Sequence, residues 1–205
     1  MYNIDTKTEF EATFTNINKD VIRGVLSSKG GILQKKEFLQ KRAVFHLPKG
    51  NEIDGAWLRV IDEQEKITLS LKIVHNNKTI EDQKEIELKV DSFENACELL
   101  ETIGCFKKAY QENLRERWVL DEVEITIDEW PYLEPYVEVE GASEIAVKST
   151  SDKLGFDYST AYFGSVGGLY SKKYGISEDR INNKTPEILF NMSQNPFVDF
   201  DNIKD

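Results

Sequence analysis

Charged side chains recur at every second position in several stretches of this sequence. Acidic pairs stand near the start of the chain and again in its second half, and basic residues lie between them. Carboxylate oxygens are the ligands that Mg²⁺ prefers, whereas lysine and arginine bind phosphate groups. Brought together on one face, such side chains would bind a phosphate compound with a divalent cation. The residues are Glu9, Glu11, Arg59, Lys72, Glu85, Glu87, Arg115, Arg117, Glu124, Asp128, Glu138 and Glu140.

Alternating apolar and polar residues surround these charges and predict the strands that carry them. A period of two is typical of a strand with one apolar and one polar face. Turn residues at Pro48, Gly50 and Gly55 separate the strands at intervals that suit an antiparallel arrangement. We expect eight strands, at residues 10–14, 42–47, 58–60, 69–73, 86–90, 114–120, 123–127 and 137–139.

Helices are fewer than strands. Ser92 is a typical N-cap and Gly104 a typical C-terminal stop for one of them. Glycines interrupt the last one, and the segment 164–168 lacks the Gly-Lys-Ser/Thr of a phosphate loop, so we interpret it as a site of close packing or bending. The predicted helices are 18–29, 92–103, 143–154 and 159–174.

Two regions are expected along the chain. Residues 1–174 form the domain that holds the strands, and residues 175–205 form a polar tail. The tail is predicted to be loop with one short helical turn near residues 187–190, and it either lacks structure or covers one end of the sheet.

The charged faces fit two arrangements. An open antiparallel sheet with helices on one side would expose them to water, which is the common case. A sheet closed into a barrel would instead turn them toward one axis, inverting the apolar interior of an ordinary small barrel. Charge at the centre of nearly every strand favours the closed form, but periodicity alone leaves both open.

Composition excludes several classes of protein. The 205 residues include 37 acidic and 26 basic ones, and the net charge of −11 disfavours binding to nucleic acid or to anionic membranes. Cys97 and Cys105 do not make a disulfide framework and indicate reduced thiols. No apolar run approaches 18 residues, and residues 1–11 are too polar for a signal peptide. We expect a cytoplasmic monomer or homodimer.

The ordered motifs are similar to those of a known family. Residues 9–13 resemble the Glu-x-Glu-x-Lys signature of the CYTH superfamily, the triphosphate tunnel metalloenzymes, which includes class IV adenylyl cyclases and thiamine triphosphatases. Four further segments resemble its Leu-Arg and Leu-Lys strands, its basic and acidic strands and its closing Glu-x-Glu strand. They are residues 57–60 with 69–72, 115–118, 125–128 and 136–141.

This resemblance implies an α+β fold in which an eight-stranded antiparallel β tunnel, a closed barrel with a polar interior, is flanked by helices. It implies Mg²⁺ or Mn²⁺ as the cofactor and a small triphosphate as the substrate. The implied metal ligands are Glu9, Glu11, Asp128, Glu138 and Glu140. The implied substrate-binding residues are Arg59, Lys72, Glu85, Arg115 and Arg117. The implied catalytic residues are Glu9, Glu11, Lys72 and Arg117.

The resemblance leaves three functions open. The first is hydrolysis of inorganic, nucleoside or thiamine triphosphate, in which water attacks the terminal phosphorus. The second is a class IV adenylyl cyclase, in which the 3′-hydroxyl of ATP attacks the α-phosphorus and pyrophosphate leaves. The third is a tunnel that binds phosphate or polyphosphate without turnover. Substrate register decides between the first two, because it sets which phosphorus meets the nucleophile.

Two departures from the family pattern favour altered or lost catalysis. Thr13 stands where the family has lysine, and Ile61 stands where a second arginine is expected after Arg59. Neither residue carries the charge that binds phosphate. Basic residues elsewhere could supply it, and the candidates are Lys41, Arg42 and Lys173.

Overall fold

The computed structural model describes residues 7–8, 10–74 and 83–198. Glu9, a predicted catalytic residue and metal ligand, lies outside them. The strands are β1 (Lys7–Thr8), β2 (Phe10–Thr15), β3 (Ile32–His46), β4 (Ala56–Asp62), β5 (Ile67–Val74), β6 (Gln83–Val90), β7 (Phe106–Leu120), β8 (Val123–Glu129), β9 (Tyr136–Gly141) and β10 (Glu187–Ile188).

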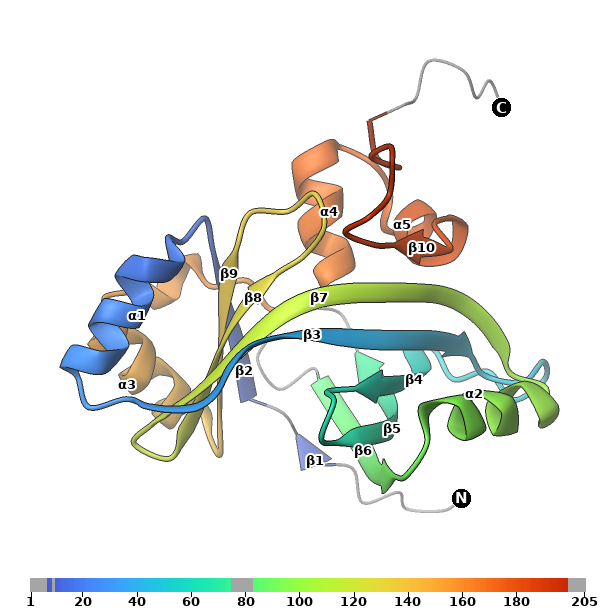
Figure 1. Ribbon diagram of the computed structural model, residues 1–205, viewed down its shortest axis with the longest axis horizontal. Helices are drawn as coiled ribbons and strands as arrows, with labels where there is room; N and C mark the ends of the chain where they lie inside the picture. Colours follow the sequence, from blue (N-terminus) through green and yellow to red (C-terminus); the bar gives the residue numbers. More distant parts are fainter. Residues whose placement is uncertain (1–6, 9, 75–82, 199–205) are drawn as a thin grey trace.

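Strands β1 to β9 form one antiparallel sheet, whose order is β1-β6-β5-β4-β3-β7-β8-β9-β2, and β10 pairs in parallel with β7. The sheet curls strongly, and β3 and β7 run across the whole molecule (Figure 1). The predicted α+β class, with eight antiparallel strands (β2 to β9) in one sheet flanked by helices, is therefore confirmed. The predicted closure of this sheet into a tunnel stays a prediction. At the two ends of the order, β1 pairs with β6 while β2, which follows it in the chain, pairs with β9.

The strands β3 and β7 are each 15 residues long, much longer than predicted. The sequence failed to indicate the first half of β3 because its pairing with β7 shifts register after Leu33 and again after Lys35. Each shift breaks the alternation of apolar and polar residues from which a strand is recognised. The first half of β7 is polar and carries little alternation of its own.

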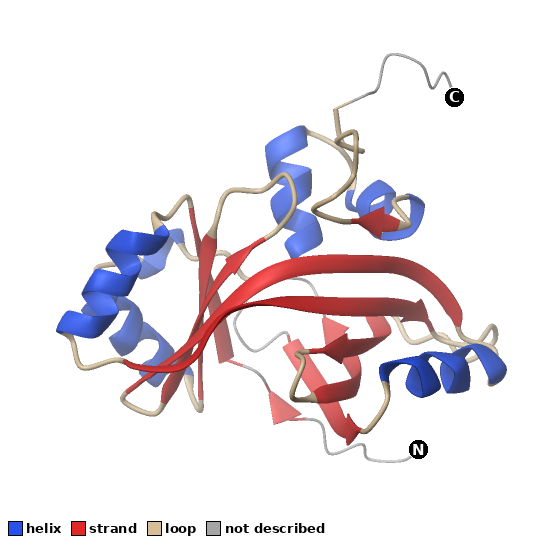
Figure 2. Cartoon of the chain, in the orientation of Figure 1, coloured by secondary structure: helices blue, strands red, loops and turns tan. Residues whose placement is uncertain are grey.

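Helices cover the outer faces of the sheet (Figure 2). The N-cap side chains of Asn18, Ser92 and Ser143 accept backbone hydrogen bonds, so the first three helices begin as predicted. No helix among the described residues is long and apolar enough to span a membrane. The helices are α1 (Lys19–Ser28), α2 (Phe93–Thr102), α3 (Glu144–Leu154), α4 (Val166–Tyr174) and α5 (Glu178–Lys184).

Apolar residues gather into separate cores on the outer side of the sheet. One core packs α1 and α3 against β2, β7, β8 and β9, with Leu26, Ile125 and Val139 fully buried. A second packs α2 against β3 and β4 and contains the free thiols of Cys97 and Cys105. Because these helices cover the apolar faces of β2, β3, β4, β7, β8 and β9, the polar faces of those strands turn to the concave side.

The predicted helix 159–174 is wrong in its first half. Residues Tyr158–Thr160 form a single 3-10 turn, and a helix begins only at Val166. Between them Tyr162 exchanges two backbone hydrogen bonds with Thr13 at the free edge of β2, at 2.9 and 3.0 Å. This long-range pairing holds the chain extended, and local sequence does not reveal it.

The tail also differs from its prediction. It contains α5, and residues 187–188 form β10 instead of a helical turn. β10 pairs in parallel with Tyr110 and Gln111 of β7, a part of that strand that β8 does not reach. An unpaired strand edge is a template for such pairing. Apolar side chains of the tail then complete a third core with Trp130 and Tyr170.

Candidate functional site

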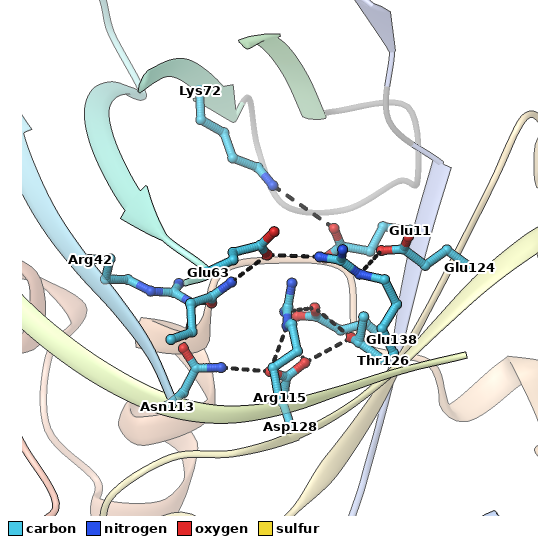
Figure 3. A network of polar contacts seen from close by, with 12 residues as sticks. Glu11, Arg42, Glu63, Lys72, Asn113, Arg115, Glu124, Thr126, Asp128 and Glu138 are labelled. Atoms are coloured by element: carbon cyan, nitrogen blue, oxygen red, sulfur yellow. Dashed lines mark hydrogen bonds and ion pairs between the residues drawn. The ribbon is translucent and has the colours of Figure 1, made fainter. Parts of the chain in front are cut away.

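The polar face of the curled sheet lines a cavity of about 1220 Å³. Eight of the ten predicted site residues line it, from six different strands. They are Glu11, Arg59, Lys72, Glu85, Arg115, Arg117, Glu138 and Glu140. Lys72 and Glu85 are more than nine-tenths buried, so this face is not an ordinary solvated one. Figure 3 shows how part of this network is connected.

Strand β7 illustrates how the alternation sorts its side chains. Arg115 and Arg117 face the cavity, whereas Glu116 and Trp118 face the helices. On that outer side Glu116 accepts hydrogen bonds from the Trp118 indole at 2.6 Å and from Arg23 of α1 at 2.9 to 3.2 Å. The outer carboxylate therefore supports the fold, and the inner guanidinium groups are left for the cavity.

Asp128 lies behind the cavity wall and is fully buried. Its two carboxylate oxygens accept from Arg115 at 2.8 and 2.9 Å, and Asn113 donates to it at 2.7 Å. Arg115 also donates to Glu138 at 2.7 Å. Although burial opposes its charge, these carboxylates hold the pKa of Arg115 well above its usual value. The geometry makes Asp128 a support for Arg115.

Arg59 and Arg117, which also line the cavity, are held in the same manner. Arg59 donates to the buried Glu85 at 2.9 and 3.1 Å and to Ser70 at 3.1 Å. Arg117 donates to Glu63 at 2.7 Å. Burial would raise the pKa of Glu63, but the charge of Arg117 and this hydrogen bond lower it below its usual value. Each guanidinium is thus fixed in direction before any ligand binds.

Carboxylates of β2 and β9 gather on the cavity face of the sheet. Burial raises the pKa of Glu138 to about 8, and repulsion from Glu11 adds to the effect. The Lys72 ammonium lies 3.9 Å from the carboxylate of Glu11. Glu140 pairs across the sheet with Glu11 and with Glu124. Crowded carboxylates that cannot all ionise at neutral pH are a place where a cation is favoured.

The carboxylate oxygens of Glu11 and Glu138 are of the kind that magnesium and manganese ions prefer. Within the described part of the chain, no three acidic, histidine or cysteine side chains gather into a complete metal site. Mg²⁺ in phosphate-handling proteins is usually held by one or two carboxylates, with water and substrate phosphates completing its shell. Glu11 and Glu138 supply such a pair.

The two departures from the family pattern have different surroundings. Thr13 is buried beside the bridge to Tyr162. Ile61 lines the cavity, and its partner across the β3–β4 pair is Arg42, which also lines it. Of the other candidates for a replacement cation, Lys41 is exposed. Lys173 donates to Glu134 and to the Tyr132 carbonyl, both at 2.8 Å, and does not line the cavity.

Sequence reasoning missed several residues of the network. Each continues the alternation of a predicted strand beyond its predicted end. Glu63 continues the alternation of Arg59 and Ile61, and Asn113 precedes Arg115 in the same alternation. Extending each predicted strand by two or three residues would have found them. The missed residues are Gln40, Glu63, Gln111 and Asn113.

The glycine-rich segment 164–168 reaches the rim of the cavity, which its residues 164–167 line. A Cβ atom on Gly168 would lie 1.9 Å from the Tyr162 hydroxyl oxygen, and one on Gly167 would lie 2.7 Å from an Asn182 side-chain oxygen. The glycines therefore permit close packing, as predicted. Asn182 of the tail also lines the cavity.

No protein-family model and no curated protein matches this sequence. Solved structures do match its fold. A protein from Pyrococcus horikoshii is 18% identical with a TM-score of 0.64, over 77% of this chain and 96% of that one. A “putative adenylate cyclase” from Vibrio parahaemolyticus is 11% identical with a TM-score of 0.68, over 80% and 98%.

A third similar structure comes from Hippeastrum and is described as a “putative adenylyl cyclase” with a dominant triphosphatase activity. It is 14% identical with a TM-score of 0.51, over 82% of this chain and 97% of that one. At such identities the likeness concerns the fold. The resemblance to the CYTH superfamily is thereby confirmed at the level of the fold.

Proposed function

From this CYTH-like fold and its charged cavity, we propose that the protein is a metal-dependent enzyme that hydrolyses a triphosphate compound. The observation that carries the proposal is the pairing of two crowded carboxylates, Glu11 and Glu138, with three fixed guanidinium groups in one cavity. A multiply charged phosphate chain and its cation complement this arrangement. Names given to the similar structures from Vibrio parahaemolyticus and Hippeastrum support the same chemistry.

We further propose that the sheet closes into a tunnel around the substrate. The support is that β1 and β2 are consecutive in the chain and pair with opposite ends of the sheet order, β6 and β9. Closure would exclude water from the sides and strengthen each electrostatic contact with the substrate.

Glu11 and Glu138 would hold the metal ion, with Glu140 of β9 and, from the sequence resemblance alone, Glu9 as further candidates. When bound, the ion would neutralise phosphate charge and lower the pKa of the attacking water. Asp128 is better suited to orienting Arg115, because both of its oxygens are already engaged with that guanidinium.

The basic residues would bind the phosphate chain and stabilise charge as it develops. Arg59, Arg115 and Arg117 present fixed donors, and each is oriented by a buried carboxylate. Preorganised donors of this kind are the largest contribution in most phosphoryl transfers. Lys72 would act as a point charge between the phosphate chain and Glu11.

Adenylyl cyclase activity is the second candidate, favoured by the name of the Vibrio parahaemolyticus structure. Product analysis separates the candidates. Purified protein is incubated with tripolyphosphate, ATP and thiamine triphosphate, with Mg²⁺ or Mn²⁺, beside a Glu9→Ala, Glu11→Ala variant. Orthophosphate that the variant does not release supports hydrolysis. Cyclic AMP with equal pyrophosphate would make the protein a cyclase, and metal-dependent binding without product would make it a binding protein.

A further inference from the structure

Arg42 of β3 is a buried cation with no carboxylate partner among the described residues. Its side chain is 8% exposed and lines the cavity. It stacks on the Trp130 ring, with the guanidinium carbon 4.3 Å from the ring centroid. A buried charge is normally paired, because taking it out of water costs several kcal/mol. The unpaired charge of Arg42 therefore indicates that an anionic ligand binds beside it.

The hydrogen bonds of Arg42 explain why its charge stays uncompensated. One terminal nitrogen, Nη2, donates to the amide oxygens of Gln40 and of Asn113, the latter at 2.8 Å. The amide nitrogens of those two residues donate in turn to Glu63 at 2.8 Å and to Asp128 at 2.7 Å. Both carboxylates are already paired with Arg117 and Arg115 (Figure 3). Both hydrogen-bond acceptors of Arg42 are therefore uncharged amide oxygens.

Two donors of Arg42 have no partner in the described part of the chain. No hydrogen bond engages its Nη1 group, and its Nε atom is buried without any acceptor. The pKa of Arg42 is lowered to about 10, first by burial and then by repulsion from Arg59 and Arg115. An anion between these guanidinium groups would relieve the repulsion and satisfy the donors.

Arg42 also lies where it can replace the arginine charge that the family pattern has at the position of Ile61. The two residues are direct partners in the β3–β4 pair, and both line the cavity. Directly opposed residues of an antiparallel pair project to the same face. A cation therefore lies on β3 directly opposite the position on β4 where the family pattern has an arginine.

We infer that Arg42 is a substrate-binding residue that contacts a phosphoryl group at the side of the cavity opposite the Glu11 and Glu138 carboxylates. In Figure 3, Arg42 lies at the left of the network, and Glu11 and Glu138 lie to its right, beyond Glu63 and Arg115. The inference rests on the proposed function and narrows its substrate class. A phosphate chain long enough to reach both sides would be bound in preference to single orthophosphate ions.

Calorimetric binding of tripolyphosphate and of orthophosphate, in EDTA to prevent metal-dependent turnover, tests the inference. Arg42→Gln should weaken tripolyphosphate binding about 10- to 100-fold, the effect of one charge-assisted contact. It should change orthophosphate binding much less. Lys107→Gln is the matched control, since that lysine is exposed beside Glu101 and does not line the cavity.

The charge swap Arg42→Ile with Ile61→Arg should restore most of the lost affinity, because it returns one cation to the same cavity from the opposing strand. A purely structural role of Arg42 would not be rescued in this manner. A folded Arg42→Gln protein that binds tripolyphosphate as tightly as the wild type would overturn the inference, as would a folded swap variant that does not bind.

A crystal of the wild type soaked with tripolyphosphate decides the question without a variant. A phosphate oxygen within hydrogen-bond distance of Arg42 supports the inference. A chain that contacts Arg59, Arg115 and Arg117 but not Arg42 overturns it and leaves the proposed function standing. A wild type that binds no tripolyphosphate, with or without Mg²⁺, overturns both.

Discussion

Arg115 and Asp128 form a two-pronged ion pair, in which Nε and one terminal nitrogen of the guanidinium lie 2.8 and 2.9 Å from the two carboxylate oxygens. They are opposed across the β7–β8 pair. Asp128 is fully buried in the sheet, and Arg115 lines the cavity. The ion pair therefore fixes the position of a cavity side chain. A change at this pair should therefore affect both stability and the proposed phosphate binding.

Replacing Asp128 by Ala should destabilise the protein by about 3–5 kcal/mol, because it leaves the buried charge of Arg115 without its main partner. Urea unfolding followed by fluorescence measures the change. Asp128→Asn keeps the shape and serves as the comparison. A loss below about 1 kcal/mol in the alanine variant would show that Glu138 alone is enough to hold Arg115.

The pKa of Glu138 predicts a pH dependence in the absence of metal. Its pKa is raised to about 8, so between about pH 4.5 and 8 the folded state holds a proton that the unfolded state has released. The free energy of unfolding should therefore fall as the pH rises through this window. Melting temperatures measured in EDTA should fall less with pH for Glu138→Gln than for the wild type.

Adding Mn²⁺ at pH 8 should reverse that loss in the wild type, since an ion that binds only the folded state stabilises it. The Glu138→Gln variant should gain less. Equal pH slopes for the two proteins in EDTA would contradict the assignment of the raised pKa to Glu138.

Glu116 and Arg117 are neighbours on β7 but face opposite sides of the sheet. Replacing Glu116 should therefore lower stability, whereas replacing Arg117 should lower activity. Glu116→Ala removes the acceptor of the Trp118 indole and of Arg23, and it should cost about 1–3 kcal/mol of stability. Arg117→Lys keeps the charge beside Glu63 but loses the planar fork, so it should lower activity and change stability little. Unfolding curves and orthophosphate release rates are measured on both variants.

Two glycine-to-alanine changes should have opposite signs. Gly168→Ala places a methyl group against the Tyr162 hydroxyl and should destabilise the α4 packing by about 1–3 kcal/mol. Gly24 lies within α1 with nothing within 4 Å of an added Cβ atom, and Gly24→Ala should stabilise by about 0.5–1 kcal/mol. Thermal unfolding of both variants checks the prediction, which a stabilising Gly168→Ala would contradict.

The faces of the strands were predictable from sequence, because a period of two survives wherever one face packs on helices. Arg115 and Glu116 differ by one position and lie on opposite sides, as their alternation requires. The strand ends were less predictable. Register shifts near Leu33 and Lys35 hide the true start of β3, whereas Gln40 was missed because the predicted strand began two residues too late to include it.

Long-range pairings account for what the sequence did not indicate. Tyr162 stays extended because it bridges to Thr13, and β10 forms because β7 offers it an open edge. The proposed role of Arg42 was likewise not predictable from local sequence. Its opposition to Ile61 depends on how β3 pairs with β4, and no local pattern distinguishes it from Lys41 or Lys173 as the replacement cation.

The rate of orthophosphate release from tripolyphosphate, with Mn²⁺ or Mg²⁺ and with EDTA, is the most direct test of the proposed activity. The wild type should release orthophosphate only with metal, and Glu138→Gln should be slower by about 100-fold or more, the usual effect of losing one preorganised charge at a phosphoryl-transfer site. Release that persists in EDTA, or that is equal in the variant, would contradict a metal-dependent reaction at the Glu11 and Glu138 carboxylates.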